Sequence, residues 1–338
     1  MVSEQQLRVW APGRVNLIGG HSDYSGGLVL PMAVDLGTTI VGHRGHERVV
    51  LVSEDEPEPA EVALDVADPA AVSPSWARYV AGVVAEVAPP TGFIGKVATT
   101  IPIGTGLSSS AALEVAVALA LVGDDRIDRR ALALACQRAE HRASGVPCGI
   151  MDQFASLLGV DGHAILIDCT TFEVTPVELP AEVDVVVVDS GQRRSLSTVG
   201  YADRRAEVGR AEQLLGHLPT ARLTDVEALD DAILRKRARH VVTENQRVRD
   251  FVSVLAKGDI GAAGALMTDS HMSLRDNQEV STDALDALVG RLNRVPGVHG
   301  ARLTGGGWGG CVVALTDPGV LDEGWTVRAS GGAYVEPL

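Results

Sequence analysis

The sequence has few cysteines, few aromatic residues, no long apolar run and a deficit of positive charge, and these shortages exclude several classes of protein. Its four cysteines are widely spaced and include no CxxC pair, so neither a disulfide framework nor a zinc site is predicted. The apolar runs are too short or too interrupted to cross a bilayer. The first residues, MVSEQQLRVW, lack the pattern of a secretory signal. We therefore expect a soluble, cytoplasmic protein.

Acidic residues outnumber basic residues by 44 to 29, which gives a formal net charge of −15 and a pI near 5.0. Proteins that bind nucleic acid or an anionic membrane present a basic face, so neither partner is expected. The 338 residues are 46% hydrophobic and 22% charged, which suffices for two domains with cores of their own. We place the domain boundary near residue 180, giving domains 1–180 and 181–338.

Strands and helices mix without strict alternation, which favours an α/β fold of the α+β type over a doubly wound sheet or a barrel. Apolar and β-branched segments predict strands at 6–10, 28–31, 38–41, 49–52, 95–100, 164–168 and 183–189. Apolar residues at three- and four-residue spacing predict helices at 75–87, 109–122, 129–144, 202–215, 226–229, 234–258 and 282–293. The segment 183–189 is almost continuously apolar, so we expect it to be buried.

Residues 102–111, PIGTGLSSSA, join a predicted strand to a predicted helix and carry the first chemical signal. Glycines let the backbone approach a ligand, and a helix N-terminus presents unpaired N–H groups to an anion. The serines add hydroxyl groups, one of which can bind Mg²⁺. The segment lacks the Gly-Lys-Ser/Thr of a Walker loop, and glycine followed by serine is also an ordinary way to begin a helix.

Residues 11–24, APGRVNLIGGHSDY, gather Arg14, His21 and Asp23 among glycines. A carboxylate close to an imidazole suits the recognition of a polyol, because each sugar hydroxyl both donates and accepts. The permanent charge of Arg14 can stabilise a phosphoryl group during transfer. A polar surface loop would have the same composition.

Residues 140–154, EHRASGVPCGIMDQF, place Glu140 near a helix end and Asp152 after a turn containing glycine and proline. Two carboxylates on separate elements can divide their work, one binding a metal and the other accepting a substrate proton. A helix-end Glu and a surface Asp are equally ordinary. Residues 304–311, TGGGWGGC, bring bare backbone beside either a ligand or a packed strand.

Together and in this order, these segments resemble the signature motifs of the GHMP kinases, and within that superfamily those of the galactokinase family. The matching segments are PGRVNLIG.H.DY, GLSSSAALEVA, CGIMDQFAS, HA.LIDC, TGGG.GGC and the helix beginning WARYVAGV, spread over nearly the whole chain. The resemblance implies a two-lobed fold with the active site in the cleft between the lobes. It also implies ATP as phosphoryl donor, Mg²⁺ as cofactor and a sugar phosphorylated at its anomeric hydroxyl.

Carried over residue by residue, the resemblance implies that Asp152 is the catalytic base and that Arg14 stabilises the transition state. It implies that Ser110 and Glu140 bind Mg²⁺. The nucleotide would lie against Gly104, Thr105, Gly106, Leu107, Ser108, Ser109, Ser110 and Trp76. The sugar would lie against Arg14, Gly20, His21, Asp23, Gly149, Asp152 and Tyr201. The protein would be a monomer or a homodimer.

One position departs from the galactokinase pattern, because Gly20 stands where that family carries Glu against the C6 end of galactose. The change removes a charged acceptor and predicts a vacant space the size of a side chain. The acceptor would then be a sugar extended beyond C6, such as an octose, a sugar altered at C6, or galactose itself with His21 binding its C6 hydroxyl. Since Asp23 and Tyr201 are retained, we favour a galacto-configured sugar with a non-standard C6 end.

Residues 192–194, QRR, also differ from many galactokinases. Two arginines near the sugar would suit an acidic or already phosphorylated acceptor, although solvated surface charges are the commoner arrangement. A function of another class, a catalytically silent sensor that binds sugar and ATP, would be expected to lose part of the GLSSSAA segment. That segment is whole, and Arg14, Glu140 and Asp152 are present, so a kinase is favoured. The CGIMDQ and GYADRR segments disfavour a GHMP kinase acting on a non-sugar alcohol.

Overall fold

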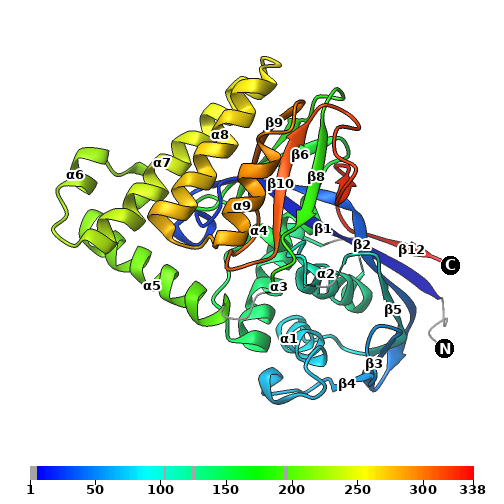
Figure 1. Cartoon of the computed structure of the whole chain (residues 1–338). Helices are drawn as coiled ribbons and strands as arrows, with labels where there is room; N and C mark the ends of the chain where they lie inside the picture. Colours follow the sequence, from blue (N-terminus) through cyan, green and yellow to red (C-terminus); the bar gives the residue numbers. More distant parts are fainter. Residues whose placement is uncertain (1–5, 103, 124–126, 194–196) are drawn as a thin grey trace.

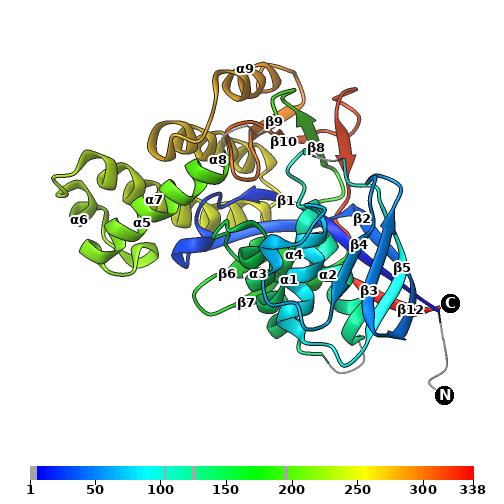
Figure 2. The same cartoon turned by 90° about the horizontal axis from the view of Figure 1, so that it is seen from below.

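The computed structural model describes residues 6–102, 104–123, 127–193 and 197–338, arranged as two halves with a β-sheet in each (Figures 1 and 2). Within these ranges the strands are β1 (Leu7–Ile18), β2 (Leu28–His46), β3 (Arg48–Ser53), β4 (Ala60–Ala63), β5 (Gly92–Thr99), β6 (His163–Asp168), β7 (Glu173–Glu178), β8 (Asp184–Asp189), β9 (Val298–Leu303), β10 (Cys311–Thr316), β11 (Trp325–Val327) and β12 (Tyr334–Pro337). The α-helices are α1 (Ala77–Val87), α2 (Ser109–Val122), α3 (Arg129–Ser144), α4 (Met151–Leu158), α5 (Ser197–Leu215), α6 (Leu223–Glu227), α7 (Ala232–Leu255), α8 (Ile260–Ser273) and α9 (Asp283–Leu292).

The first sheet has the strand order β12-β1-β2-β5-β3-β4, and β6 and β7 extend it from the other end of β2. The sequence predicts two strands at 28–31 and 38–41, but the structure has one continuous strand, β2. Pro31 is tolerated inside it because β2 pairs with β6 only at Leu28 and Val29, and with β5 only from Thr38 onward. Between these stretches neither β6 nor β5 pairs with that edge of β2, so the N–H donor that proline lacks is not needed there.

Helices α1 to α4 pack together against the first sheet (Figure 2). After its first two serines, helix α2 is apolar on all sides except at Glu114, as in the segment ALEVAVALALV, and most of its residues are buried. A helix with this composition belongs in the interior of a protein, and α2 lies between β1, β2 and the other three helices. The N-terminus of this rigid helix carries the predicted phosphate-binding segment.

The second sheet has the order β11-β8-β10-β9 and is antiparallel throughout. The four valines 185–188 of β8 are all buried, which confirms the prediction for this strand. Val185 and Val187 face a core shared with α7, whereas Val186 and Val188 face α9. Both faces of the strand are therefore covered, and this explains the absence of polar alternation in its sequence.

The two halves of the molecule are joined by strand pairing and by a common core. β12, at the C-terminal end of the chain, pairs with β1, and Val15 and Leu17 of β1 pack in one core with Phe251 and Val313. The second sheet lies wholly within residues 181–338, but β12 returns to the first sheet. The boundary near residue 180 therefore remains a prediction.

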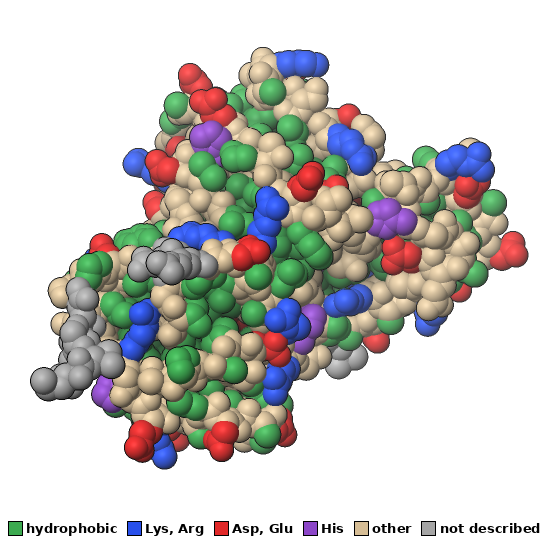
Figure 3. Space-filling model, turned by 180° about the vertical axis from the view of Figure 1, so that it is seen from behind, with side chains coloured by type: hydrophobic (Ala, Val, Ile, Leu, Met, Phe, Trp, Pro, Cys, Tyr) green, Lys and Arg blue, Asp and Glu red, His purple; other side chains and the backbone are tan. Residues whose placement is uncertain are grey.

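Two helices were not predicted from the sequence. Helix α4 follows a segment rich in glycine and proline, and α8 contains the small residues of GAAGA, so neither shows a strong apolar period. Acidic and basic side chains are interspersed over the face shown in Figure 3. Of the helices in the described ranges, none is long and apolar enough to cross a membrane.

Candidate active site

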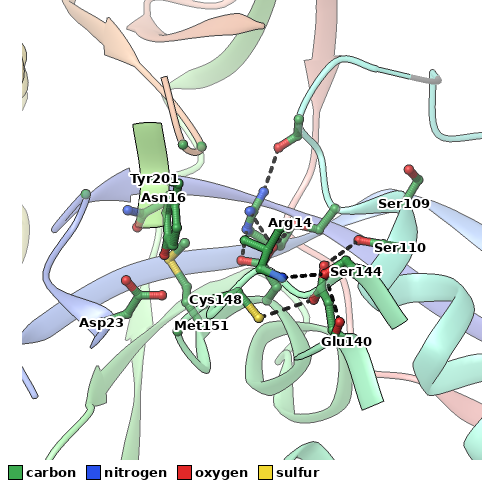
Figure 4. A pocket seen from close by; sticks show the side chains of 18 of the residues that line it. Arg14, Asn16, Asp23, Ser109, Ser110, Glu140, Ser144, Cys148, Met151 and Tyr201 are labelled. Carbon is green, nitrogen blue, oxygen red and sulfur yellow. Dashed lines mark hydrogen bonds and ion pairs between the residues drawn. The ribbon is translucent and has the colours of Figure 1, made fainter. Parts of the chain in front are cut away.

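A cavity of about 500 Å³ lies between the two halves of the molecule, a size that suits a small-molecule ligand. The residues predicted from the sequence that line it are Arg14, Gly20, His21, Asp23, Gly104, Gly106, Ser108, Ser109, Ser110, Glu140, Gly149, Asp152 and Tyr201. Figure 4 shows Asp23 and Tyr201 at one end, Ser110 and Glu140 at the other, and Arg14 between them. Residues separated by almost the whole sequence thus meet in one place.

An ion pair between Arg14 and Asp152 occupies the middle of the cavity. Arg14 is a buried residue of β1, and Asp152 lies in the first turn of α4. Nε and Nη2 of Arg14 donate to the two carboxylate oxygens over 2.7 and 2.6 Å, and Nη1 donates to the Gly106 carbonyl over 2.7 Å. The Ser108 hydroxyl also donates to Asp152. Asp152 therefore faces the phosphate loop (residues 104–110), as the kinase hypothesis requires.

The phosphate loop is held against β1 in a conformation that leaves the start of α2 open to the cavity. The N–H of Arg14 donates to the Leu107 carbonyl over 3.1 Å, an approach that leaves no room for a side chain at Gly13. Ser108, at the N-cap of α2, has φ of 60°, which is rare for a residue other than glycine and gathers at functional sites. In the described structure its hydroxyl does not cap the helix, so the first-turn N–H groups are suited to an anion.

Ser110 and Glu140 meet at the phosphate end of the cavity. The Ser110 hydroxyl donates to Oε1 of Glu140 over 3.2 Å. Burial, and next the neighbouring Asp152, raise the pKa of Glu140, so this end gathers negative charge that a cation would stabilise. Within the described ranges no cluster of three or more His, Cys, Asp or Glu side chains forms a metal site. Mg²⁺ in phosphoryl-transfer enzymes typically takes one or two protein oxygens and completes its shell with phosphates and water, which these two residues fit.

The opposite end of the cavity carries Asp23 and Tyr201. A Cβ on Gly149 would collide with the carboxylate of Asp23, so only glycine at position 149 permits this placement. Burial, and next the charge of Asp152, raise the pKa of Asp23 to about 6. The ring of Tyr201 lies against that of His21, with centroids 5.4 Å apart. A carboxylate and a phenol facing one space suit an acceptor with several hydroxyls.

His21 lines the cavity as predicted, but both of its ring nitrogens are hydrogen-bonded within the protein. Nε2 lies 3.2 Å from the Gly306 carbonyl, which can only accept, so Nε2 carries the proton. Nδ1 then accepts from the Tyr24 hydroxyl over 3.0 Å. Burial lowers the pKa of His21 to about 3, so the ring is neutral. In this arrangement neither nitrogen is available for the C6 hydroxyl of a sugar.

The prediction of a vacant space beside Gly20 is wrong, because Arg302 fills that space. A Cβ on Gly20 would collide with Nη2 of Arg302, a fully buried residue of β9. Nη1 donates to the Asn16 carbonyl over 3.0 Å, whereas Nε and Nη2 have no hydrogen-bond partner among the described residues. Burial lowers the pKa of Arg302 to about 10, so the side chain is charged at neutral pH. A buried cation therefore lies behind Gly20, outside the lining of the cavity.

Three residues predicted to contact the nucleotide, Trp76, Thr105 and Leu107, are outside the lining of the cavity as the structure describes it. Trp76 packs in the core of the first half and donates its indole N–H to a backbone carbonyl over 3.0 Å. The Thr105 hydroxyl donates to the Pro102 carbonyl over 2.7 Å. The Leu107 side chain is buried in the core shared by the two halves. These positions give all three side chains a role in packing or in shaping the loop.

Several residues that the sequence did not single out as binding residues also line the cavity: Asn16, Tyr79, Ser144, Val146, Cys148, Met151, Gly305 and Gly306. Asn16 is two residues from Arg14 on β1 and shares its face, so the strand period could have identified it. The contact of the Cys148 thiol with Glu140, 3.5 Å from Oε2, has no such local signal. Gly305 and Gly306 show that the glycine strip brings bare backbone to the cavity.

The QRR segment divides between the cavity and the protein surface. Arg193 lines the cavity across from Gly104. The side-chain oxygen of Gln192 accepts a hydrogen bond from Thr282 over 2.7 Å, and Arg194 lies outside the described residues. One arginine of this segment is therefore near the phosphate loop rather than near Asp23.

Three family models match this chain. The galactokinase galactose-binding signature matches residues 2–44, the GHMP kinases N terminal domain matches residues 77–160, and the GHMP kinases C terminal model matches residues 251–325. Together they include Arg14, Asp23, the phosphate loop, Glu140 and Asp152.

Curated relatives match over most of their length. Human galactokinase is 44% identical over 332 residues, which cover 93% of this chain and 85% of the human protein. Galactokinase of Chloroflexus aurantiacus is 40% identical over 359 residues, which cover 97% and 90%. The crystal structure of Lactococcus lactis galactokinase complexed with galactose has a TM-score of 0.88 at 31% identity, covering 98% and 95%. A mevalonate kinase structure, at a TM-score of 0.66 and 20% identity over 98% of each chain, shares the fold.

Proposed function

Because this chain is a sugar kinase of the galactokinase family within the GHMP kinases, we propose that it transfers the γ-phosphoryl group of ATP to the anomeric hydroxyl of D-galactose, with Mg²⁺ as cofactor. The observation that carries the proposal is the hydrogen-bonded chain from Gly106 through Arg14 to Asp152. It links the place where phosphates would bind to the carboxylate that would take the hydroxyl proton.

The phosphate loop and Arg14 provide what phosphoryl transfer requires, namely alignment and neutralisation of charge. The ATP phosphates would lie at the N-terminus of α2. Ser110 and Glu140 would hold Mg²⁺ there, and the metal would supply positive charge that neutralises the phosphates. The anomeric oxygen attacks the γ-phosphorus, the bond to the β–γ bridging oxygen breaks, and ADP leaves. The guanidinium of Arg14 is fixed by two partners and so can stabilise the charge on the transferring group without reorganising.

Asp152 accepts the proton that the anomeric hydroxyl loses. Both of its oxygens accept from Arg14, and Oδ2 also accepts from Ser108, which leaves a lone pair of Oδ1 for the sugar hydroxyl. Asp23 and Tyr201 bind further hydroxyls of the ring and orient the anomeric carbon toward the phosphate loop. Orientation of this kind lowers the barrier by bringing the reacting atoms together before the reaction.

The C6 end of the acceptor decides which sugar is preferred. Arg302 fills the space beside Gly20 that was expected to be vacant, and the human and Lactococcus lactis relatives are galactokinases, the latter solved with galactose. Both points support D-galactose over the non-standard C6 end favoured from the sequence. One observation favours a second candidate: the buried guanidinium of Arg302 lies behind Gly20, outside the cavity lining, and its positive charge would favour a carboxylate at C6, as in galacturonic acid.

Steady-state ADP release with galactose, galacturonate, fucose, arabinose and a longer aldose tests the proposal. We expect the highest kcat/KM for D-galactose. A higher value for galacturonate that is lost in an Arg302→Met variant would instead favour the second candidate. Binding of sugar and ATP without turnover on any acceptor would contradict both and favour a silent sensor.

A further inference from the structure

Gln153 follows Asp152 in the first turn of α4, but its side chain points into the protein rather than into the cavity. The residue is fully buried. Its amide nitrogen donates to Oε2 of Glu140 over 2.7 Å and to Oε2 of Glu114 over 3.0 Å. A single neutral amide thus bridges two carboxylates, one at the edge of the cavity on α3 and the other inside the core on α2.

Packing alone does not account for this group of side chains. Glu114 is fully buried in the part of α2 that is otherwise apolar, after Ser110. Its Oε1 has no hydrogen-bond partner in the described ranges, nor has Oε1 of Gln153. Each buried polar atom left without a partner costs about 1–3 kcal/mol. Replacing buried polar groups by apolar side chains of similar volume is often neutral or stabilising. Gln153 and Glu114 are therefore better explained by what they do to Glu140.

The bridge divides the two oxygens of Glu140 between different tasks. Oε2 is held from inside by the Gln153 amide and by the Cys148 thiol. Oε1 is left on the side of the phosphate loop, where the Ser110 hydroxyl contacts it. The carboxylate plane is therefore fixed by a neutral donor that is itself anchored on α2, the helix that carries Ser110.

We propose that Gln153, anchored by Glu114, is a positioning residue that holds Glu140 in the orientation needed to bind the metal of the ATP complex. The inference rests on the proposed metal site at Ser110 and Glu140. Partners that orient a metal ligand typically change metal affinity by about 10- to 100-fold when removed. Because Gln153 and Asp152 are adjacent in one helical turn, the device also ties the metal ligand to the proton acceptor.

Metal binding without turnover is the direct test, with Gln153→Met as the main variant. Methionine keeps the length of the side chain but donates no hydrogen bond. Gln137→Met is the matched control, because Gln137 is a partly buried glutamine whose amide also donates a hydrogen bond, to the backbone carbonyl of Cys148 over 3.1 Å. Free Mn²⁺ is measured by electron paramagnetic resonance in the presence of ADP and the absence of sugar. We expect Mn²⁺ to bind Gln153→Met about 10-fold or more weakly than wild type, and Gln137→Met about as tightly as wild type.

The remaining outcomes separate this inference from the proposed function. Unchanged Mn²⁺ affinity in a folded Gln153→Met protein would overturn the inference while leaving the metal site intact. Wild-type Mn²⁺ affinity in Glu140→Gln would instead show that the metal binds elsewhere, which would overturn the proposed metal site and the inference with it. If Gln153→Met does not fold, Glu114→Met removes the anchor while Gln153 stays, and weakened Mn²⁺ binding is expected there too.

Discussion

At the scale of single residues, the site concentrates charges of both signs in a small volume. Asp23, Asp152 and Glu140 line one cavity together with the buried Arg14, and the raised pKa values of Asp23 and Glu140 follow first from burial and next from the charge of Asp152. The arrangement suits a site that receives Mg²⁺ with its substrate, because the added positive charge compensates the excess carboxylates. The negative charge of these carboxylates is therefore balanced only when the substrates and Mg²⁺ are bound.

Asp152→Asn keeps the shape of the side chain but removes the proton acceptor. We expect kcat to fall about 10²- to 10⁴-fold, which is the usual contribution of a general base, whereas Mn²⁺–ADP binding stays close to that of wild type. The measurement is steady-state kinetics together with nucleotide binding, and Asp322→Asn, an exposed position, serves as control. A variant that keeps more than about a tenth of wild-type kcat would show that Asp152 only orients the hydroxyl.

Asp23→Asn tests how much folding stability is lost by burying the charged carboxylate of Asp23. The folded-state pKa of Asp23 is raised from 3.8 to about 6, so the folded protein binds more protons than the unfolded chain between these values and loses stability as the pH rises through this window. A shift of this size corresponds to at most about 3 kcal/mol, less where water in the cavity screens the charge. We expect Asp23→Asn to be more stable than wild type near neutral pH, with the difference vanishing near pH 4, in denaturant unfolding. Its KM for sugar should rise.

Equal stability differences at the two pH values would contradict this account of Asp23. A loss of stability at neutral pH would do so more strongly, because it would mean that the carboxylate makes favourable contacts in the folded protein that outweigh its burial.

At the scale of elements, three segments set the geometry: β1 carries Arg14, the phosphate loop leads into α2, and α4 carries Asp152 and Gln153. The extent of α2, residues 109–122, is predicted from its apolar sequence, as is that of α3, residues 129–144. The start of α4 is not predicted, because the glycines and proline before it are typical of a loop. Those residues allow the chain to approach Asp23 closely. The glycine and proline that the site needs are thus the same residues that indicate a loop, and they obscure the start of the helix.

Gly149→Ala tests this close approach. The added methyl group would collide with the carboxylate of Asp23, and because that carboxylate is the end of a side chain it can turn away. We therefore expect a folded protein whose KM for galactose rises about 10-fold or more, a loss of the order of one charged hydrogen bond. Gly209→Ala, in the middle of α5 where a Cβ meets nothing within 4 Å, is the control and should be about 0.5–1 kcal/mol more stable. An unchanged KM for galactose in Gly149→Ala would show that Asp23 does not contribute to sugar binding.

At the scale of the whole molecule, the active site depends on a fold that brings both ends of the sequence together. β12 pairs with β1 (Figure 1), and the same β1 carries Arg14 to the phosphate loop. The motifs and the resemblance identify most of the lining residues, because each motif is local. Arg302 beside Gly20 is a contact between residues far apart in the sequence, and no local pattern predicts it. For that reason the space at Gly20 was misjudged from the sequence.

The central claim is that Asp152 and the phosphate loop act on the anomeric hydroxyl of a sugar. The most direct test is ³¹P and ¹H NMR of the product formed from ATP, Mg²⁺ and D-galactose. The account predicts a single sugar phosphate whose phosphorus couples to the anomeric proton, formed in equal amount with ADP. Phosphate on another hydroxyl, or ADP released without a sugar phosphate, would contradict it.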